Sequence, residues 1–329
     1  MKRKNKLIIL VTFIALIILG IYLSWDKIIA YLHAFEKYKK ITEENVTIED
    51  LNIDKEEAFR ELTSIDHNDI EYKNTNNIPL TLDIYGPKKI RRGGSPVLIY
   101  VHGGSWAYGS NAIPEFMEPI LDFFREEGFT VISTEYQLME DEVIFYKQVS
   151  DIKDTVRWIN KNRDIYNFDT ENVGIIGVSS GAHLAMMAAY SENEEFIDDT
   201  ELEKYNSKIK YLIDFFGPTD LSTLDINNAG STFEEIINSL GDKKEEIIQE
   251  YSPVNYVGAD EPKTLIIHST EDQLVPYENA ESLFKKLIDT KNKAEIVTLE
   301  GTSHDFSEFN EENIKDVGIN IFKFIIDNL

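Results

Sequence analysis

The fold is decided by residues 173–183, which read VGIIGVSSGAH. An apolar run leads into the G-x-S-x-G motif, and a helix-forming run follows it. This order predicts a strand, a sharp turn and a helix, with Ser179 held above the edge of a sheet. Glycine is required at Gly177 and Gly181 because Cβ atoms there would collide with the neighbouring strand and helix. The N-terminus of the helix would favour negative charge on the serine oxygen.

The motif alone also fits a glycine-rich turn that carries two surface serines. The remaining elements of the chain are needed to distinguish this turn from one that holds a nucleophile. Two alternating stretches, 70–73 and 80–85, are typical of half-buried strands. Apolar runs and helical spacing predict the other elements. They are strands at 97–101, 129–134, 173–178, 210–216, 264–268 and 294–299, helices at 114–127 and 143–163, a helical insertion at 219–263 and a C-terminal helix.

The strand at 97–101 is almost continuously apolar, as expected for a parallel strand that is covered on both faces. Strands and helices alternate from there onward, which is typical of a doubly wound α/β sheet. We therefore expect a mostly parallel, eight-stranded sheet flanked by helices, with the insertion lying over the edge where the parallel strands end.

Residues 102–106 (HGGSW) directly follow the first buried strand. A glycine pair at such a strand end gives backbone N–H groups room to point at a bound oxyanion. The other half of this oxyanion hole would be the N–H of Ser180. We expect the amide of Gly104 to be the donor from this loop, with the amides of Gly103 and Ser105 as alternatives. We interpret His102 as orienting the loop by hydrogen bonding rather than as taking protons.

A serine nucleophile needs a base that takes its proton, and the base needs a carboxylate that fixes its tautomer. The strand–turn–helix motif resembles the nucleophile turn of α/β-hydrolases, and in that family the chain order is serine, acid, histidine. Of the six histidines, only His304 follows both Ser179 and the turn after strand 264–268. Asp272 in that turn is the expected acid, and Glu271 is its alternative.

In combination, these motifs resemble the α/β-hydrolase superfamily. Within it, the chain is similar to the esterase/lipase group with an HGGxW oxyanion motif, which includes carbohydrate-esterase-like and kynurenine-formamidase-like proteins. The resemblance covers about residues 69–329. It rests on the motifs at 102–106, 177–181, 217–220 (GPTD), 252–253 (SP) and 272–276 (DQLVP), and on His304. The chain departs from the hormone-sensitive-lipase branch at Ser105, where a third glycine is usual, and Ser180 stands where alanine is common.

The resemblance implies an α/β-hydrolase fold and a serine carboxylesterase that hydrolyses small acyl esters through an acyl-enzyme. O-acetyl groups of sugars are one expected substrate class. The implied chemistry needs no metal and no organic cofactor. Two alternatives stay open: an amidase or formamidase of the same fold, and a catalytically inactive hydrolase-like binding protein.

Composition excludes several classes of function. The chain has no cysteine, so disulfides, thiol catalysis and cysteine-ligated metals are excluded. Its formal net charge of −26 argues against nucleic acid as a partner. We interpret the acidic residues as a solvated exterior without a recognition role.

The N-terminal region predicts a membrane anchor. Residues 2–6 are basic, and residues 7–25 carry no charge over a length that can cross a bilayer as a helix. No small-residue cleavage site follows, so we expect an uncleaved single-pass anchor, with secretion after signal cleavage as the alternative. Residues 1–25 would form the cytoplasmic tip and anchor, 26–64 a helical stalk and linker, and 65–329 a catalytic domain outside the cytoplasm.

Overall fold

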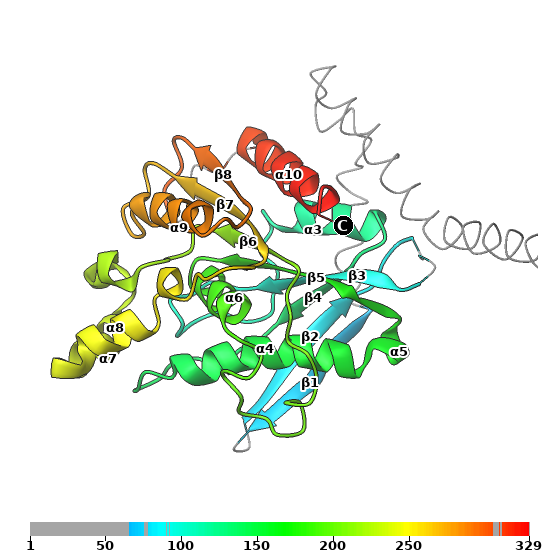
Figure 1. The fold of residues 1–329 in the computed structure, drawn as a ribbon, viewed down its shortest axis with the longest axis horizontal. Helices are drawn as coiled ribbons and strands as arrows, with labels where there is room; N and C mark the ends of the chain where they lie inside the picture. Colours follow the sequence, from blue (N-terminus) through cyan, green and yellow to red (C-terminus); the bar gives the residue numbers. More distant parts are fainter. Residues whose placement is uncertain are drawn as a thin grey trace, which may run out of the picture.

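The computed structural model of the protein describes residues 66–75, 78–89, 91, 93–304, 309 and 311–328. Within these residues, eight strands form one sheet in the order β1-β2-β4-β3-β5-β6-β7-β8 (Figure 1). The strands are β1 (His67–Thr75), β2 (Ile78–Tyr85), β3 (Ser95–Val101), β4 (Thr130–Thr134), β5 (Phe168–Val178), β6 (Tyr211–Phe215), β7 (Lys263–Ser269) and β8 (Ala294–Leu299). β2 pairs antiparallel with both β1 and β4, and the other pairs are parallel. The predicted eight-stranded, mostly parallel sheet is confirmed.

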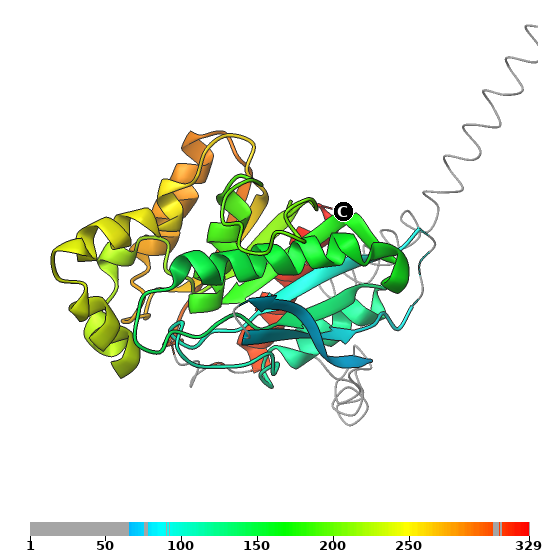
Figure 2. The same ribbon diagram turned by 90° about the horizontal axis from the view of Figure 1, so that it is seen from below.

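Helices cover both faces of the sheet. They are α3 (Glu118–Glu126), α4 (Phe145–Lys161), α5 (Arg163–Tyr166), α6 (Ser180–Tyr190), α7 (Ser231–Ser239), α8 (Lys244–Glu250), α9 (Glu278–Asp289) and α10 (Glu311–Ile326). Side chains of α4, α6 and α9 belong to one buried apolar cluster, and those of α3 and α10 belong to a second one. Figure 2 shows these layers edge-on. The two clusters explain why β3 is buried along its whole length.

Two elements begin four or five residues from the predicted position. β5 begins at Phe168 rather than at residue 173, because a polar segment, 169–172, continues the strand beyond the apolar run. The register with β3 shifts between Pro96 and Val97, where this early part of β5 joins the sheet. Helix α3 begins at Glu118 rather than at residue 114, which places Pro119 in the first turn, where a missing N–H breaks no helical hydrogen bond.

The predicted insertion between β6 and β7 is helical. It contains α7, α8 and the short 3₁₀ turns η2 (Leu221–Thr223), η3 (Ile226–Asn228), η4 (Gly241–Lys243) and η5 (Pro253–Asn255). In Figures 1 and 2, α7 and α8 lie together at one end of the molecule, away from β1. The apolar side of α7 is buried through Phe233, Ile236 and Ile237, so the insertion packs onto the body of the domain.

The described helices include none with the length and apolarity that a membrane crossing requires. The predicted anchor at residues 7–25 and the predicted stalk at 26–64 lie outside the described residues.

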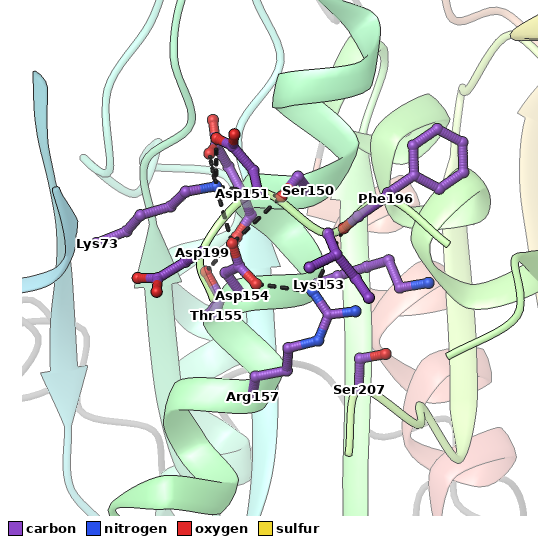
Figure 3. A network of polar contacts seen from close by, with 12 residues as sticks. Lys73, Ser150, Asp151, Lys153, Asp154, Thr155, Arg157, Phe196, Asp199 and Ser207 are labelled. Atoms are coloured by element: carbon purple, nitrogen blue, oxygen red, sulfur yellow. Dashed lines mark hydrogen bonds and ion pairs between the residues drawn. The ribbon is translucent and has the colours of Figure 1, made fainter. Parts of the chain in front are cut away.

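A buried network of charges joins the edge strand β1 to α4 (Figure 3). Lys73 Nζ lies 2.7 Å from Asp151 Oδ1 and 2.8 Å from Asp154 Oδ2. Asp154 Oδ1 in turn accepts a hydrogen bond of 2.7 Å from Arg157 Nη1. All four side chains are almost completely buried. A buried charge needs a partner because it has lost its hydration, so each member depends on the others.

We expect Lys73→Met to lower the free energy of unfolding by about 3–5 kcal/mol, because it keeps the aliphatic stem but leaves the buried carboxylate of Asp151 without its cation. Urea denaturation of the full-length protein measures this change. Lys285→Met is the matched control, since its ion pair with Asp289 is exposed and its loss should leave the unfolding midpoint unchanged. Equal midpoints for the two variants would show that the buried network does not stabilise the fold.

Candidate active site

A sharp turn between β5 and α6 holds Ser179. Its φ of 53° and ψ of −120° lie where residues with a side chain are rarely found. A Cβ at Gly177 would come within 2.4 Å of the carbonyl oxygen of Gly181. A Cβ at Gly181 would lie 2.4 Å from the carbonyl oxygen of Val101, at the end of β3. The two glycines therefore allow the turn to fit against its neighbours, as the motif predicts.

The structure brings Ser179, His304 and Asp272 into one hydrogen-bonded series. Ser179 Oγ lies 2.9 Å from His304 Nε2, and His304 Nδ1 lies 2.7 Å from Asp272 Oδ2. Each residue follows a different parallel strand: β5, β7 and β8 end just before Ser179, Asp272 and His304 respectively. Parallel strands place their carboxyl ends at the same edge of a sheet, so residues distant in sequence meet there.

Asp272 is held as an ionised acceptor. Its Oδ1 accepts hydrogen bonds of 2.9 Å from the N–H groups of Leu274 and Val275. Burial alone would raise its pKa, but hydrogen bonds from His268 and His304 outweigh burial, so the pKa of Asp272 is held well below its ordinary value. A carboxylate in this state can fix the tautomer of His304, with the proton on Nδ1 and a lone pair on Nε2 toward Ser179.

Glu271, the alternative acid, is engaged elsewhere. Its Oε2 accepts hydrogen bonds from the hydroxyls of Thr270, at 2.8 Å, and Ser269, at 3.1 Å, and from the N–H of Gly301, at 3.0 Å. The carboxylate in contact with His304 Nδ1 is therefore that of Asp272.

The HGGSW loop packs directly against Ser179. A Cβ at Gly103 would lie 3.3 Å from the Ser179 Cβ and 2.9 Å from the carbonyl oxygen of Val178. In the part of the chain described, the N–H groups of Gly103, Gly104 and Ser180 donate to no acceptor. These amides are therefore free to bind a negatively charged oxygen next to Ser179.

His102 is turned into the protein and orients the loop. Its Nδ1 donates a hydrogen bond of 2.7 Å to the carbonyl of Gly103, and its ring stacks on Tyr136 with centroids 4.4 Å apart. Burial lowers its pKa. This placement agrees with our interpretation of His102 as a residue that orients the loop.

Two further histidines near the site received no role from the sequence. His268 Nε2 lies 2.8 Å from the carbonyl oxygen of Val275 and 3.3 Å from Asp272 Oδ2. His183 accepts a hydrogen bond of 3.1 Å from the indole N–H of Trp106. Chain order excluded both as the base, but nothing in the linear sequence indicates these tertiary contacts.

The arrangement can support nucleophilic attack with proton transfer, using a serine, a histidine and a carboxylate with free amides beside them. In the residues that the structure describes, no three His, Asp or Glu side chains gather in a way that could hold a metal ion. That the chemistry needs no cofactor stays a prediction.

Proteins with similar chains include esterases. The chain is 25% identical to the esterase LipC of Mycobacterium tuberculosis, and the match covers 68% of this chain and 56% of LipC. It is 26% identical to the esterase LipQ of the same organism, and that match covers 59% of this chain and 46% of LipQ. It therefore spans about half the length of these curated relatives.

Among solved structures, a truncated carbohydrate esterase from gut microbiota is 25% identical, with a TM-score of 0.65 over 79% of this chain and 96% of that one. The propionate-bound thermophilic esterase of Thermogutta terrifontis, at 22% identity, shares the fold, with a TM-score of 0.64 over 79% and 93%. The BD-FAE family model matches residues 82–287, which is more than half of the chain. The protein therefore belongs to the BD-FAE family of α/β-hydrolases.

Proposed function

We propose that the protein is a serine carboxylesterase that hydrolyses small acyl esters. The observation that carries this proposal is the hydrogen-bonded series from Ser179 through His304 to Asp272, at distances of 2.9 and 2.7 Å. The membership of an esterase-related family and the named activities of its relatives support the same chemistry.

In the first half of the reaction, Ser179 Oγ attacks the ester carbonyl carbon while its proton moves to His304 Nε2. The negative charge of Asp272 stabilises the imidazolium that forms. The N–H groups of Gly104 and Ser180, with Gly103 as the alternative loop donor, hold the oxyanion of the tetrahedral intermediate. His304 then gives its proton to the departing alcohol oxygen, and the acyl group stays on Ser179.

In the second half, water enters beside His304. The Nε2 atom takes a proton from the water as its oxygen attacks the acyl carbon, and the same amides hold the second oxyanion. Collapse of this intermediate returns the proton to Ser179 Oγ and releases the carboxylic acid. The exposure of His304 suits this role, because its side chain is 16% exposed whereas the Asp272 carboxylate is fully buried.

Acetyl esters of sugars are the first substrates to test. A carbohydrate esterase is among the structures with the same fold at 25% identity. Acetylated sugars, p-nitrophenyl acetate and a matched anilide form the panel. Faster cleavage of the anilide than of the esters would favour an amidase, and cleavage of none of them would favour an inactive hydrolase-like binding protein.

We further propose that residues 7–25 anchor the protein in the cell membrane with the catalytic domain outside the cytoplasm. The uncharged run, its basic flank at residues 2–6 and the lack of a small-residue cleavage site support this placement. Such a tether would keep the enzyme close to esters at the cell surface.

Ser179→Ala should lower kcat/KM for p-nitrophenyl acetate by roughly 10⁴-fold or more, because it removes the nucleophile. Ser180→Ala is the matched control and should keep most of the activity. Its hydroxyl is buried, and its backbone N–H is retained. An inactive Ser180→Ala enzyme beside an active Ser179→Ala enzyme would show that the wrong serine was chosen.

Asp272→Asn should lower kcat by roughly 10⁴-fold, because an amide favours the wrong tautomer of His304. His304→Ala should cost about as much as Ser179→Ala, since the three residues act as a unit. Glu271→Gln is the control and should leave kcat within about 3-fold of the wild type. Steady-state kinetics distinguish the acids: a larger loss in Glu271→Gln than in Asp272→Asn would assign the role to Glu271.

Protease added to intact cells should digest the catalytic domain if residues 7–25 anchor it outside. Digestion only after lysis would place the domain inside. N-terminal sequencing of the mature protein should find residues 1–6, whereas their loss would indicate a cleaved signal. Deletion of residues 1–40 should leave the hydrolysis of water-soluble esters unchanged, because Ser179, Asp272 and His304 lie far along the chain.

A further inference from the structure

The oxyanion loop adopts an unfavourable backbone conformation. Gly104, Ser105 and Trp106 have φ values of 128°, 50° and 60°. Such values cost about 1–2 kcal/mol for a residue with a side chain, so two successive ones persist only where the surroundings hold them. The side chain of Trp106 is the obvious candidate for this support, because only 2% of the residue is exposed.

The indole of Trp106 is bound to the helix that follows the nucleophile. Its Nε1–H donates a hydrogen bond of 3.1 Å to His183 Nδ1, and the two rings meet edge to face with centroids 5.2 Å apart. His183 lies one turn into α6, and its N–H donates to the carbonyl of Ser179 at 3.1 Å. The hydrogen bond thus connects the loop that carries Gly104 to the helix that begins with Ser180.

The second nitrogen of His183 fixes its tautomer. Nε2 lies 2.7 Å from the carbonyl oxygen of Tyr251, which can only accept, so Nε2 carries the proton. Nδ1 is then a bare acceptor directed at the indole N–H. Burial lowers the pKa of His183 to about 4, so the ring stays neutral near neutral pH and this pairing persists.

Other contacts hold the rest of Trp106. Its carbonyl accepts hydrogen bonds from the N–H of Met139, at 3.0 Å, and from Gln148 Nε2, at 2.9 Å. Phe233 of α7 packs on the indole, with ring centroids 4.4 Å apart. These contacts fix the backbone and one face of the ring, but they leave the bond to His183 as the polar link to α6.

We propose that His183 is a positioning residue: its hydrogen bond with Trp106 sets the loop amide of Gly104 against the helix amide of Ser180, so that both can bind one oxyanion. The proposal rests on the proposed esterase function. An oxyanion hole assembled from two segments stabilises the transition state only if the distance between the segments is fixed. A buried histidine that merely fills space would contribute to stability but not to this distance.

Two substitutions of His183 separate its two hydrogen bonds. His183→Asn places an amide oxygen near the position of Nδ1 and keeps an acceptor for Trp106, whereas His183→Gln places an amide nitrogen near Nε2 and keeps the donor to Tyr251. Each variant loses one bond of the same buried side chain, so their thermal unfolding midpoints should fall by similar amounts. Trp106→Phe keeps an aromatic ring at this position but removes the indole N–H that donates to His183 Nδ1.

The full-length protein, purified in detergent, is assayed with p-nitrophenyl acetate. We expect His183→Gln and Trp106→Phe to lower kcat by roughly 10- to 100-fold and to leave KM within about 3-fold of the wild-type value. This loss of kcat is smaller than the loss expected when an oxyanion donor is removed altogether. His183→Asn should retain most of kcat. Binding of a phenylboronic acid, whose adduct with the serine imitates the tetrahedral intermediate, should weaken in His183→Gln and Trp106→Phe by about the same factor as kcat/KM.

Equal kcat for His183→Asn and His183→Gln, or an unchanged kcat for Trp106→Phe, would overturn the positioning role. Should the histidine variants fail to fold, Trp106→Phe alone decides. The proposed function fails in a different way: a wild-type protein that cleaves no ester overturns both proposals. An active wild type, an inactive Ser179→Ala and unaffected Trp106 and His183 variants overturn this inference alone.

Discussion

The close approach of α6 to the end of β3 is the constraint on which the site depends. It brings the backbone of Gly181 so near the carbonyl groups of Val101 and His102 that an added Cβ would lie 2.4 and 2.3 Å from their oxygens. Any side chain at Gly181 would push the helix away from the strand. The same approach places the oxyanion loop beside Ser179 and within reach of His183. One steric condition therefore brings the proposed nucleophile, the loop and the helix amide together.

Burial distinguishes the three histidines around the site. His183 and His268 are fully buried, and both have a backbone carbonyl as partner on Nε2. His304 is partly exposed and directs its Nε2 to a serine hydroxyl. A buried ring whose Nε2 contacts a backbone carbonyl holds structure, whereas a ring open to solvent can exchange protons with substrate and water. The protein thus uses histidine both for structural support and for the proposed proton transfer, and the surroundings of each ring determine its role.

The sequence was most informative where a motif or a periodic pattern carries the signal. Apolar runs and alternation predicted all eight strands, and chain order selected His304 and Asp272, which the structure brings together with Ser179. It was least informative where a tertiary contact leaves no motif or periodicity in the chain. The polar start of β5 is a strand only because β3 pairs with it. Likewise Trp106 and His183, 77 positions apart, show no periodicity or motif that links them.

The helical insertion belongs to the same argument as the oxyanion loop. Phe233 of α7 packs on the indole of Trp106, and the carbonyl of Tyr251, just after α8, accepts from His183. The segment that varies most easily in a hydrolase, a surface insertion, is therefore in direct contact with both partners of the bond that we assign to loop positioning. A change in the insertion that moves Phe233 or the Tyr251 carbonyl would displace Trp106 or His183 directly, even where the insertion does not touch the substrate. Since packed contacts transmit small displacements rather than absorb them, the insertion would constrain the proposed oxyanion hole through this pair of contacts.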